Sequence, residues 1–144
     1  MSNPPVFHGL NLVVRDMEAA IAFYRRLGVT IRDTDPEWMP HHRNMVTPDG
    51  VDLDLDSVEF AKQWNRGWPG GSGGNTGVIG FSLASRQSVD DTYADLVTAG
   101  YRSQQEPYDA FWGARYAVVE DPDGNAVGLM SPLDDAHRSQ PTPP

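Results

Sequence analysis

The sequence predicts an α+β fold made of two βαβββ modules within one domain. Three observations support this. A β-rich run is followed by an amphipathic helix pattern once in each half of the chain. The turn sequence Pro-Asp-Gly precedes the last strand pattern of each half, at residues 48–50 and 122–124. The 144 residues, 39% of them hydrophobic, are enough for one compact domain with a core.

The first module is expected over residues 6–66. A β-rich run predicts the first strand at 6–14, and Asp16 follows it as the N-cap of a helix. Apolar residues at three- and four-residue spacing continue this helix to Leu27, where Gly28 ends it. The remaining elements are strands at 29–34, 43–47 and 51–56 and a short helix at 57–64.

The second module, residues 77–132, repeats this order. Its elements are a strand at 77–84, a helix at 89–99 that ends before Gly100, and strands at 101–105, 112–119 and 125–130. Residues 67–76 between the modules are glycine-rich and lack the Gly-Lys-Ser/Thr ending of a phosphate-binding loop, so they are interpreted as a flexible linker. The polar, proline-rich segment 133–144 is predicted to be disordered.

Charge and composition exclude several classes of function. The formal net charge of −9 disfavours binding to nucleic acid or to anionic membranes, and it favours either cationic ligands or simple solubility. The absence of cysteine excludes disulfides, thiolate nucleophiles and cysteine-ligated zinc. No apolar run approaches the ~20 residues that cross a bilayer, and the polar start is unlike a signal peptide. A cytoplasmic protein is therefore expected.

Two segments carry a family resemblance. Residues 10–24, LNLVVRDMEAAIAFY, and residues 116–125, YAVVEDPDGN, resemble the opening and closing runs of vicinal oxygen chelate proteins. This superfamily includes glyoxalase I, extradiol dioxygenases, fosfomycin-resistance enzymes and bleomycin-resistance binding proteins. The resemblance covers about residues 6–132 and implies paired modules whose sheets curl around a cavity, usually within a homodimer. The metal-free, bleomycin-resistance-like members are the most similar.

The resemblance also implies four metal-ligand positions, on the first and last strand of each module. In this sequence they fall on Gly9, Asp54, Val78 and Gly128. Only the aspartate offers a donor atom, whereas catalytic zinc sites typically keep about three protein ligands. No catalytic metal and no cofactor are therefore expected.

A rebuilt metal site would have to use other side chains. The candidates are His8, His41, His42, Asp52 and Asp56. If the two adjacent histidines lie on a strand, they cannot both face one centre, because side chains alternate along a strand. His8 shares a strand face with leucine and valine side chains and is expected to pack there, one residue out of register with the ligand position.

Strand alternation also predicts which residues line a cavity. The inward positions are rich in small side chains, at Gly9, Gly80, Ala126 and Gly128, which leaves room for a ligand or for closure by neighbouring side chains. Asp52, Asp54 and Asp56 share one strand face, which is either a cation site or a solvated surface. The predicted ligand-binding residues are Asn11, Trp38, Asp52, Asp54, Ser82, Trp112, Tyr116 and Gly128.

The leading functional hypothesis is a homodimeric, metal-free protein that binds a cationic or aromatic small molecule, with its tryptophans stacking on the ligand. The alternative is a divalent-metal-dependent lyase, isomerase or dioxygenase with a rebuilt metal site. A third hypothesis is a metal-free enzyme with an acid–base pair, such as Asp54 with a tyrosine or histidine, although no spacing singles out such a pair.

Overall fold

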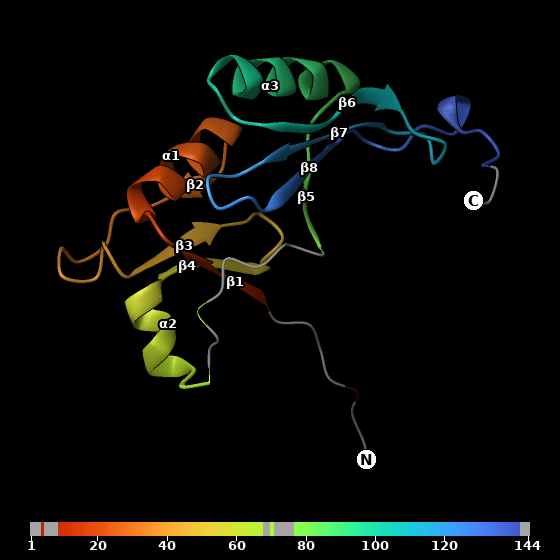
Figure 1. The fold of residues 1–144 in the computed structure, drawn as a ribbon. Helices are drawn as coiled ribbons and strands as arrows, with labels where there is room; N and C mark the ends of the chain where they lie inside the picture. Colours follow the sequence, from red (N-terminus) through yellow and green to blue (C-terminus); the bar gives the residue numbers. More distant parts are fainter. Residues whose placement is uncertain (1–3, 5–8, 68–69, 71–76, 142–144) are drawn as a thin grey trace. The chain divides into compact units, whose positions relative to one another are not determined.

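A computed structural model describes residues 4, 9–67, 70 and 77–141 (Figure 1). The chain divides into two compact units, Met1–Ser72 and Gly73–Pro144. Among the described residues, each unit holds one four-stranded sheet with parallel and antiparallel pairs. The predicted α+β class is thereby confirmed.

The N-terminal unit has the order βαβββ followed by a short helix. Its elements are β1 (Gly9–Val14), α1 (Met17–Leu27), β2 (Thr30–Ile31), β3 (His42–Val46), β4 (Asp52–Ser57) and α2 (Val58–Trp64). The sheet order is β1-β4-β3-β2, with β1 parallel to β4 and the other pairs antiparallel. The predicted short helix is present, and the Ser57 side chain caps it.

Helix α1 begins and ends where the sequence predicts. The Asp16 carboxylate accepts a hydrogen bond from the Ala19 amide at 3.1 Å, and Gly28 ends the helix with φ 112°. One face of the helix is buried, and it includes Phe23 and Tyr24, both with no exposed surface. This face, together with Leu53 and Leu55 of β4, forms the apolar core of the unit.

The second strand is much shorter than predicted. Only Thr30–Ile31 pair with β3, whereas the sequence pattern extended over 29–34. Two arginines explain the difference. The Arg43 guanidinium, 2% exposed, donates to the Arg32 carbonyl at 2.9 Å and to the Asp33 carboxylate at 2.8 Å, and Arg25 donates to the Ile31 carbonyl at 2.6 Å. Side chains rather than a neighbouring strand therefore satisfy these backbone groups.

The C-terminal unit repeats the topology of the first. Its elements are β5 (Val78–Ser82), α3 (Arg86–Thr98), β6 (Ser103–Asp109), β7 (Arg115–Glu120), β8 (Ala126–Met130) and the 3₁₀ turn η1 (Asp135–His137). The sheet order β5-β8-β7-β6 corresponds strand for strand to β1-β4-β3-β2. The turn glycines also correspond, with φ 80° at Gly50 and φ 83° at Gly124.

Three elements in this unit differ from the prediction by three or more residues at one end. Helix α3 starts three residues early because Ser85 and Ser88 form a reciprocal capping box. The sixth strand runs over Ser103–Asp109 rather than 101–105. Trp112 lies in a turn rather than at the start of β7, because the Ala110 amide bonds to the Ala114 carbonyl at 2.8 Å and closes the chain before that strand.

The segment after β8, for which the composition predicts disorder, is described as far as residue 141. The Asp134 amide donates to the Gly113 carbonyl at 3.0 Å, and the Ser139 amide donates to the Phe111 carbonyl at 2.9 Å. Most of the predicted linker 67–76 lies outside the described residues. None of the helices in the described ranges has both the length and the apolar character that a membrane crossing requires.

Candidate functional site

Polar side chains gather on one face of the N-terminal sheet. In one row across the sheet, Asp54 of β4 lies between Asn11 of β1 and Asn44 of β3. In the next row, Asp56 of β4 lies beside His42 of β3. Since side chains alternate along β4, the aspartates lie opposite Leu53 and Leu55, the core side of the strand. The structure thus brings the predicted residues Asn11, Asp52 and Asp54 onto one face.

Asp56 is the centre of this polar face. Its side chain has no exposed surface, and its two oxygens have separate partners. Asn11 Nδ2 donates to Oδ2 at 2.8 Å, and His42 Nδ1 lies 2.6 Å from Oδ1. The family resemblance favoured Asp54 instead. The Asp54 carboxylate is only half-buried, and it accepts a hydrogen bond from the side-chain amide of Asn44. Strand register, which sets His42 opposite Asp56, is the signal that was missed.

The first strand approaches its neighbour closely at Gly9. A Cβ atom there would lie 2.5 Å from the Asp52 carbonyl oxygen, too close for any other residue without a backbone shift. Gly9 therefore allows β1 and β4 to approach closely. It also occupies one of the four metal-ligand positions that the family resemblance implies.

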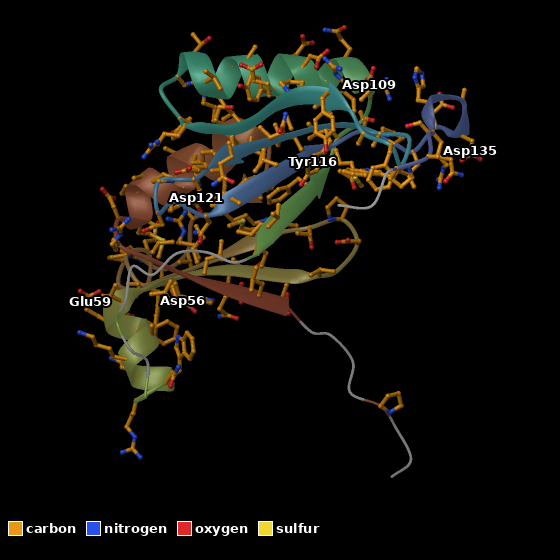
Figure 2. The ribbon with its side chains drawn as sticks, turned by 45° about the vertical axis from the view of Figure 1, so that its right-hand side comes forward. Asp56, Glu59, Asp109, Tyr116, Asp121 and Asp135 are labelled. Carbon is orange, nitrogen blue, oxygen red and sulfur yellow. The ribbon has the colours of Figure 1, made fainter. Side chains whose placement is uncertain are left out.

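Trp38 lies in a separate groove of the N-terminal unit, with a volume of about 270 Å³. The groove is lined by Glu37, Trp38, His41, Glu59, Phe60 and Gln63. The Trp38 and Phe60 rings meet edge to face with centroids 5.3 Å apart. Figure 2 shows Glu59 on α2 and Asp56 nearby. The sequence did not predict that Trp38 and α2 form a groove, because their contact joins a loop to a distant helix.

In the C-terminal unit, the predicted inward residues also share one face. In one row across the sheet, Gly128 of β8 lies between Gly80 of β5 and Val118 of β7. In the next row, Met130 of β8 lies between Ser82 of β5 and Tyr116 of β7. The position at Gly128 is filled rather than open. A Cβ atom there would lie 2.8 Å from the Tyr116 hydroxyl and 3.1 Å from Val78 Cγ1. The Tyr116 side chain (labelled in Figure 2) therefore covers Gly128, whereas a Cβ atom added at Gly80 would meet no atom within 4 Å apart from its chain neighbours.

Four rings form what we call the aromatic row: Tyr108, Phe111, Trp112 and Tyr116. The ring centroids of Trp112 and Tyr116 lie 5.4 Å apart, those of Tyr108 and Tyr116 6.3 Å apart, and those of Phe111 and Trp112 5.1 Å apart. The structure therefore brings the predicted residues Trp112 and Tyr116 together. Tyr108 and Phe111, 37% and 47% exposed, were not among the predicted residues, although Tyr108 lies opposite Tyr116 in the sheet.

Tyr116 provides a pH-dependent test of the aromatic row. Burial raises the pKa of its phenol above the usual value of about 10, and the neighbouring Tyr108 raises it further. The neutral phenol is therefore favoured in the folded state, so its stabilising contribution is complete below pH of about 10 and is lost as the pH rises further. We expect Tyr116→Phe to reduce the fall in unfolding free energy at alkaline pH, measured by urea unfolding. If the unfolding free energy falls as much in Tyr116→Phe as in the parent protein, the result would contradict burial of the Tyr116 phenol.

These two faces lie on a fold whose relatives are known. A family model described as the Glyoxalase/Bleomycin resistance protein/Dioxygenase superfamily matches residues 6–129, most of the chain. The chain belongs to this superfamily. The family resemblance found in the sequence is therefore confirmed at the level of the superfamily.

Solved structures show the same fold. A glyoxalase/bleomycin resistance protein/dioxygenase from Nocardioides is 25% identical, with TM-score 0.70, covering 99% of this chain and 93% of that one. A glyoxalase/bleomycin resistance protein/dioxygenase family enzyme from Burkholderia phytofirmans is 20% identical, with TM-score 0.74 and coverage of 88% and 98%. A lactoylglutathione lyase from Agrobacterium tumefaciens is 20% identical, with TM-score 0.65 and coverage of 89% and 94%. No curated protein matches the chain.

The residues at the four metal-ligand positions do not fit a metal centre of the kind the resemblance implies. Gly9, Val78 and Gly128 have no donor side chain, and the Tyr116 ring covers Gly128. Asp54 already accepts a hydrogen bond from Asn44. Within residues 9–67 and 77–141, no three His, Asp or Glu side chains are grouped as metal ligands would be; His8 lies outside these ranges.

Proposed function

We propose that this member of the superfamily binds a planar organic molecule without a catalytic metal, and that the aromatic row of the C-terminal unit is its stacking surface. The observation that carries the proposal is the Tyr116 ring lying across Gly128, where the resemblance implies a metal ligand. An aromatic surface thus replaces a donor atom at that position. Aromatic rings bind flat or cationic molecules through stacking and cation–π contacts.

Two further features support this proposal. Ser82 and Gly80 are exposed on the same sheet face, so this part of the face offers a hydroxyl group beside a surface without side chains. The net charge of −9 favours a guest that carries positive charge over an anionic one. Asp52 and Asp54 are proposed to contribute to this negative charge, whereas the uncharged Asn11 is proposed to hold the Asp56 carboxylate through its hydrogen bond.

The test is ligand binding to the aromatic row. We expect acriflavine, a planar aromatic cation, to raise the melting temperature and to quench tryptophan fluorescence. Trp112→Ala is expected to weaken binding by about tenfold or more, because stacking on one aromatic side chain is worth about 1–3 kcal/mol. Trp64→Ala removes an exposed tryptophan of the other unit and serves as the control.

Retained acriflavine binding in Trp112→Ala, or none in the parent protein, would overturn this assignment. The competing hypothesis, a divalent-metal enzyme, is tested on the same sample by elemental analysis after purification without chelators. One equivalent of bound nickel, zinc, iron or manganese would favour the metal enzyme and count against our proposal.

We further propose that the protein acts as a homodimer in the cytoplasm. Val78 supports the dimer, because it is 54% exposed on β5, an edge strand of its sheet, and edge strands readily pair with another chain. Sedimentation velocity of the full chain tests this, and a monomer at high protein concentration would rule it out. Neither nucleic acid nor membrane is proposed as a partner, because the strongly negative charge repels phosphate backbones and anionic membranes.

A further inference from the structure

We propose that the groove between α2 and residues 37–41 is a second binding site, one that takes the ammonium head group of an organic cation. The site lies wholly within the N-terminal unit. It is independent of the aromatic row, so it does not depend on the proposed function. The inference comes from the way the groove is held together, from its aromatic pair and from its unpaired carboxylates.

Ser57 holds the two walls of the groove together. Its amide donates to the His41 carbonyl at 2.8 Å, and its hydroxyl oxygen accepts the Phe60 amide at 3.1 Å as the cap of α2. The same oxygen lies 2.9 Å from His41 Nδ1. Ser57 is itself buried. The wall that carries Trp38 and the wall that carries Phe60 are thus linked before any ligand binds, which reduces the ordering cost of binding.

The aromatic pair provides the surface for a cation. Trp38 is 44% exposed, and its ring meets Phe60 at an interplanar angle of 73°. Phe60 also contacts the His42 ring edge to face, with centroids 5.6 Å apart. The exposed part of the indole is available to a ligand, and tryptophan is the side chain that attracts cations most strongly through its ring face.

Two carboxylates set the sign of the ligand charge. Glu37 and Glu59 both line the groove. Across the ranges 9–67 and 77–141, no hydrogen bond or ion pair of the structure uses either carboxylate. The cation of α2, Lys62, is not among the lining residues. A groove with two negative charges and two aromatic rings therefore favours a cation over an anion or a neutral molecule.

The size of the groove limits what part of a ligand it can hold. Its volume of about 270 Å³ is slightly below the roughly 300–1,000 Å³ of sites that enclose a drug-sized molecule. It therefore suits an alkylammonium group with a short apolar stem, with Gln63 as a hydrogen-bonding partner one helical turn from Glu59.

The experiment compares 2-phenylethylammonium with its neutral analogue 2-phenylethanol, by calorimetric titration of the full chain at low salt. We expect the ammonium compound to bind about tenfold or more tightly than the alcohol, since two nearby carboxylates stabilise only the charged ligand. Glu59→Gln is expected to reduce ammonium binding severalfold and to leave binding of the alcohol unchanged. Trp38→Ala is expected to weaken binding of both compounds.

Matched controls separate this site from others. Glu18→Gln changes an exposed glutamate in the first turn of α1, and Trp64→Ala changes an exposed tryptophan of α2 that does not line the groove. Both are expected to bind like the parent protein. Equal affinity for the two compounds, no binding by the parent protein, or no effect of Glu59→Gln would each overturn the inference. If Trp112→Ala abolishes ammonium binding while Trp38→Ala does not, the groove proposal fails and the aromatic row remains supported.

Discussion

Replacing Asp56 with alanine is expected to lower the free energy of unfolding by about 2–4 kcal/mol, because it removes a buried carboxylate and leaves two polar partners without an acceptor. Asn11 and His42 are those partners, at 2.8 Å and 2.6 Å. In a chain of this length the melting temperature should fall by roughly 5–12 °C. Urea unfolding followed by circular dichroism measures the change.

The matched control for Asp56 is Asp54→Ala, on the same face of the same strand. Asp54 is half-buried and has one amide partner, so its replacement is expected to cost less than about 1 kcal/mol. Asp56→Asn keeps an acceptor oxygen and should fall between the two. Equal losses at the two positions would show that Asp56 is not the buried centre of the polar face.

Two glycines that pair across β5 and β8 are expected to respond oppositely to alanine. At Gly128 an added Cβ atom would lie 2.8 Å from the Tyr116 hydroxyl, whereas at Gly80 nothing lies within 4 Å. We expect Gly128→Ala to cost about 1–3 kcal/mol through crowding. Gly80→Ala should be neutral or stabilising by up to about 1 kcal/mol, because alanine loses less backbone entropy on folding. Urea unfolding of both variants measures the difference.

A double-mutant cycle identifies the cause of the Gly128 effect. If the Tyr116 ring is what the added methyl meets, Gly128→Ala should cost much less in a Tyr116→Ala background. Acriflavine binding should also weaken in Gly128→Ala, because a displaced Tyr116 leaves its contact with Trp112. Additive effects in the cycle would mean that Tyr116 does not cover this glycine.

The local elements were predictable because their signals lie within a few residues of one another. Asp16 and Gly28 delimit α1, and Gly50 and Gly124 form equivalent turns in the two units. Prediction was poorer where side chains compete for backbone groups. The second strand was overestimated because Arg43, whose guanidinium bonds residues 32 and 33, follows it by about ten positions in the sequence.

The candidate site was predictable as a face but not as a set of contacts. Alternation alone placed the β4 aspartates on one side of the sheet, and the family resemblance then favoured Asp54 over Asp56. The difference depends on His42 lying opposite Asp56, which is a matter of register between β3 and β4. Trp112 was predicted in a strand but lies in the turn that precedes β7.

The sequence by itself determined the two repeated modules, the ends of α1 and the lack of donor side chains at Gly9, Val78 and Gly128, because these follow from residue identity and short-range periodicity. Only the tertiary structure decided that Asp56 is the buried carboxylate and that Tyr116 covers Gly128. Both depend on which residues of different strands become neighbours. Neighbours of that kind are set by packing of the whole sheet, and residues close in the sequence do not specify them.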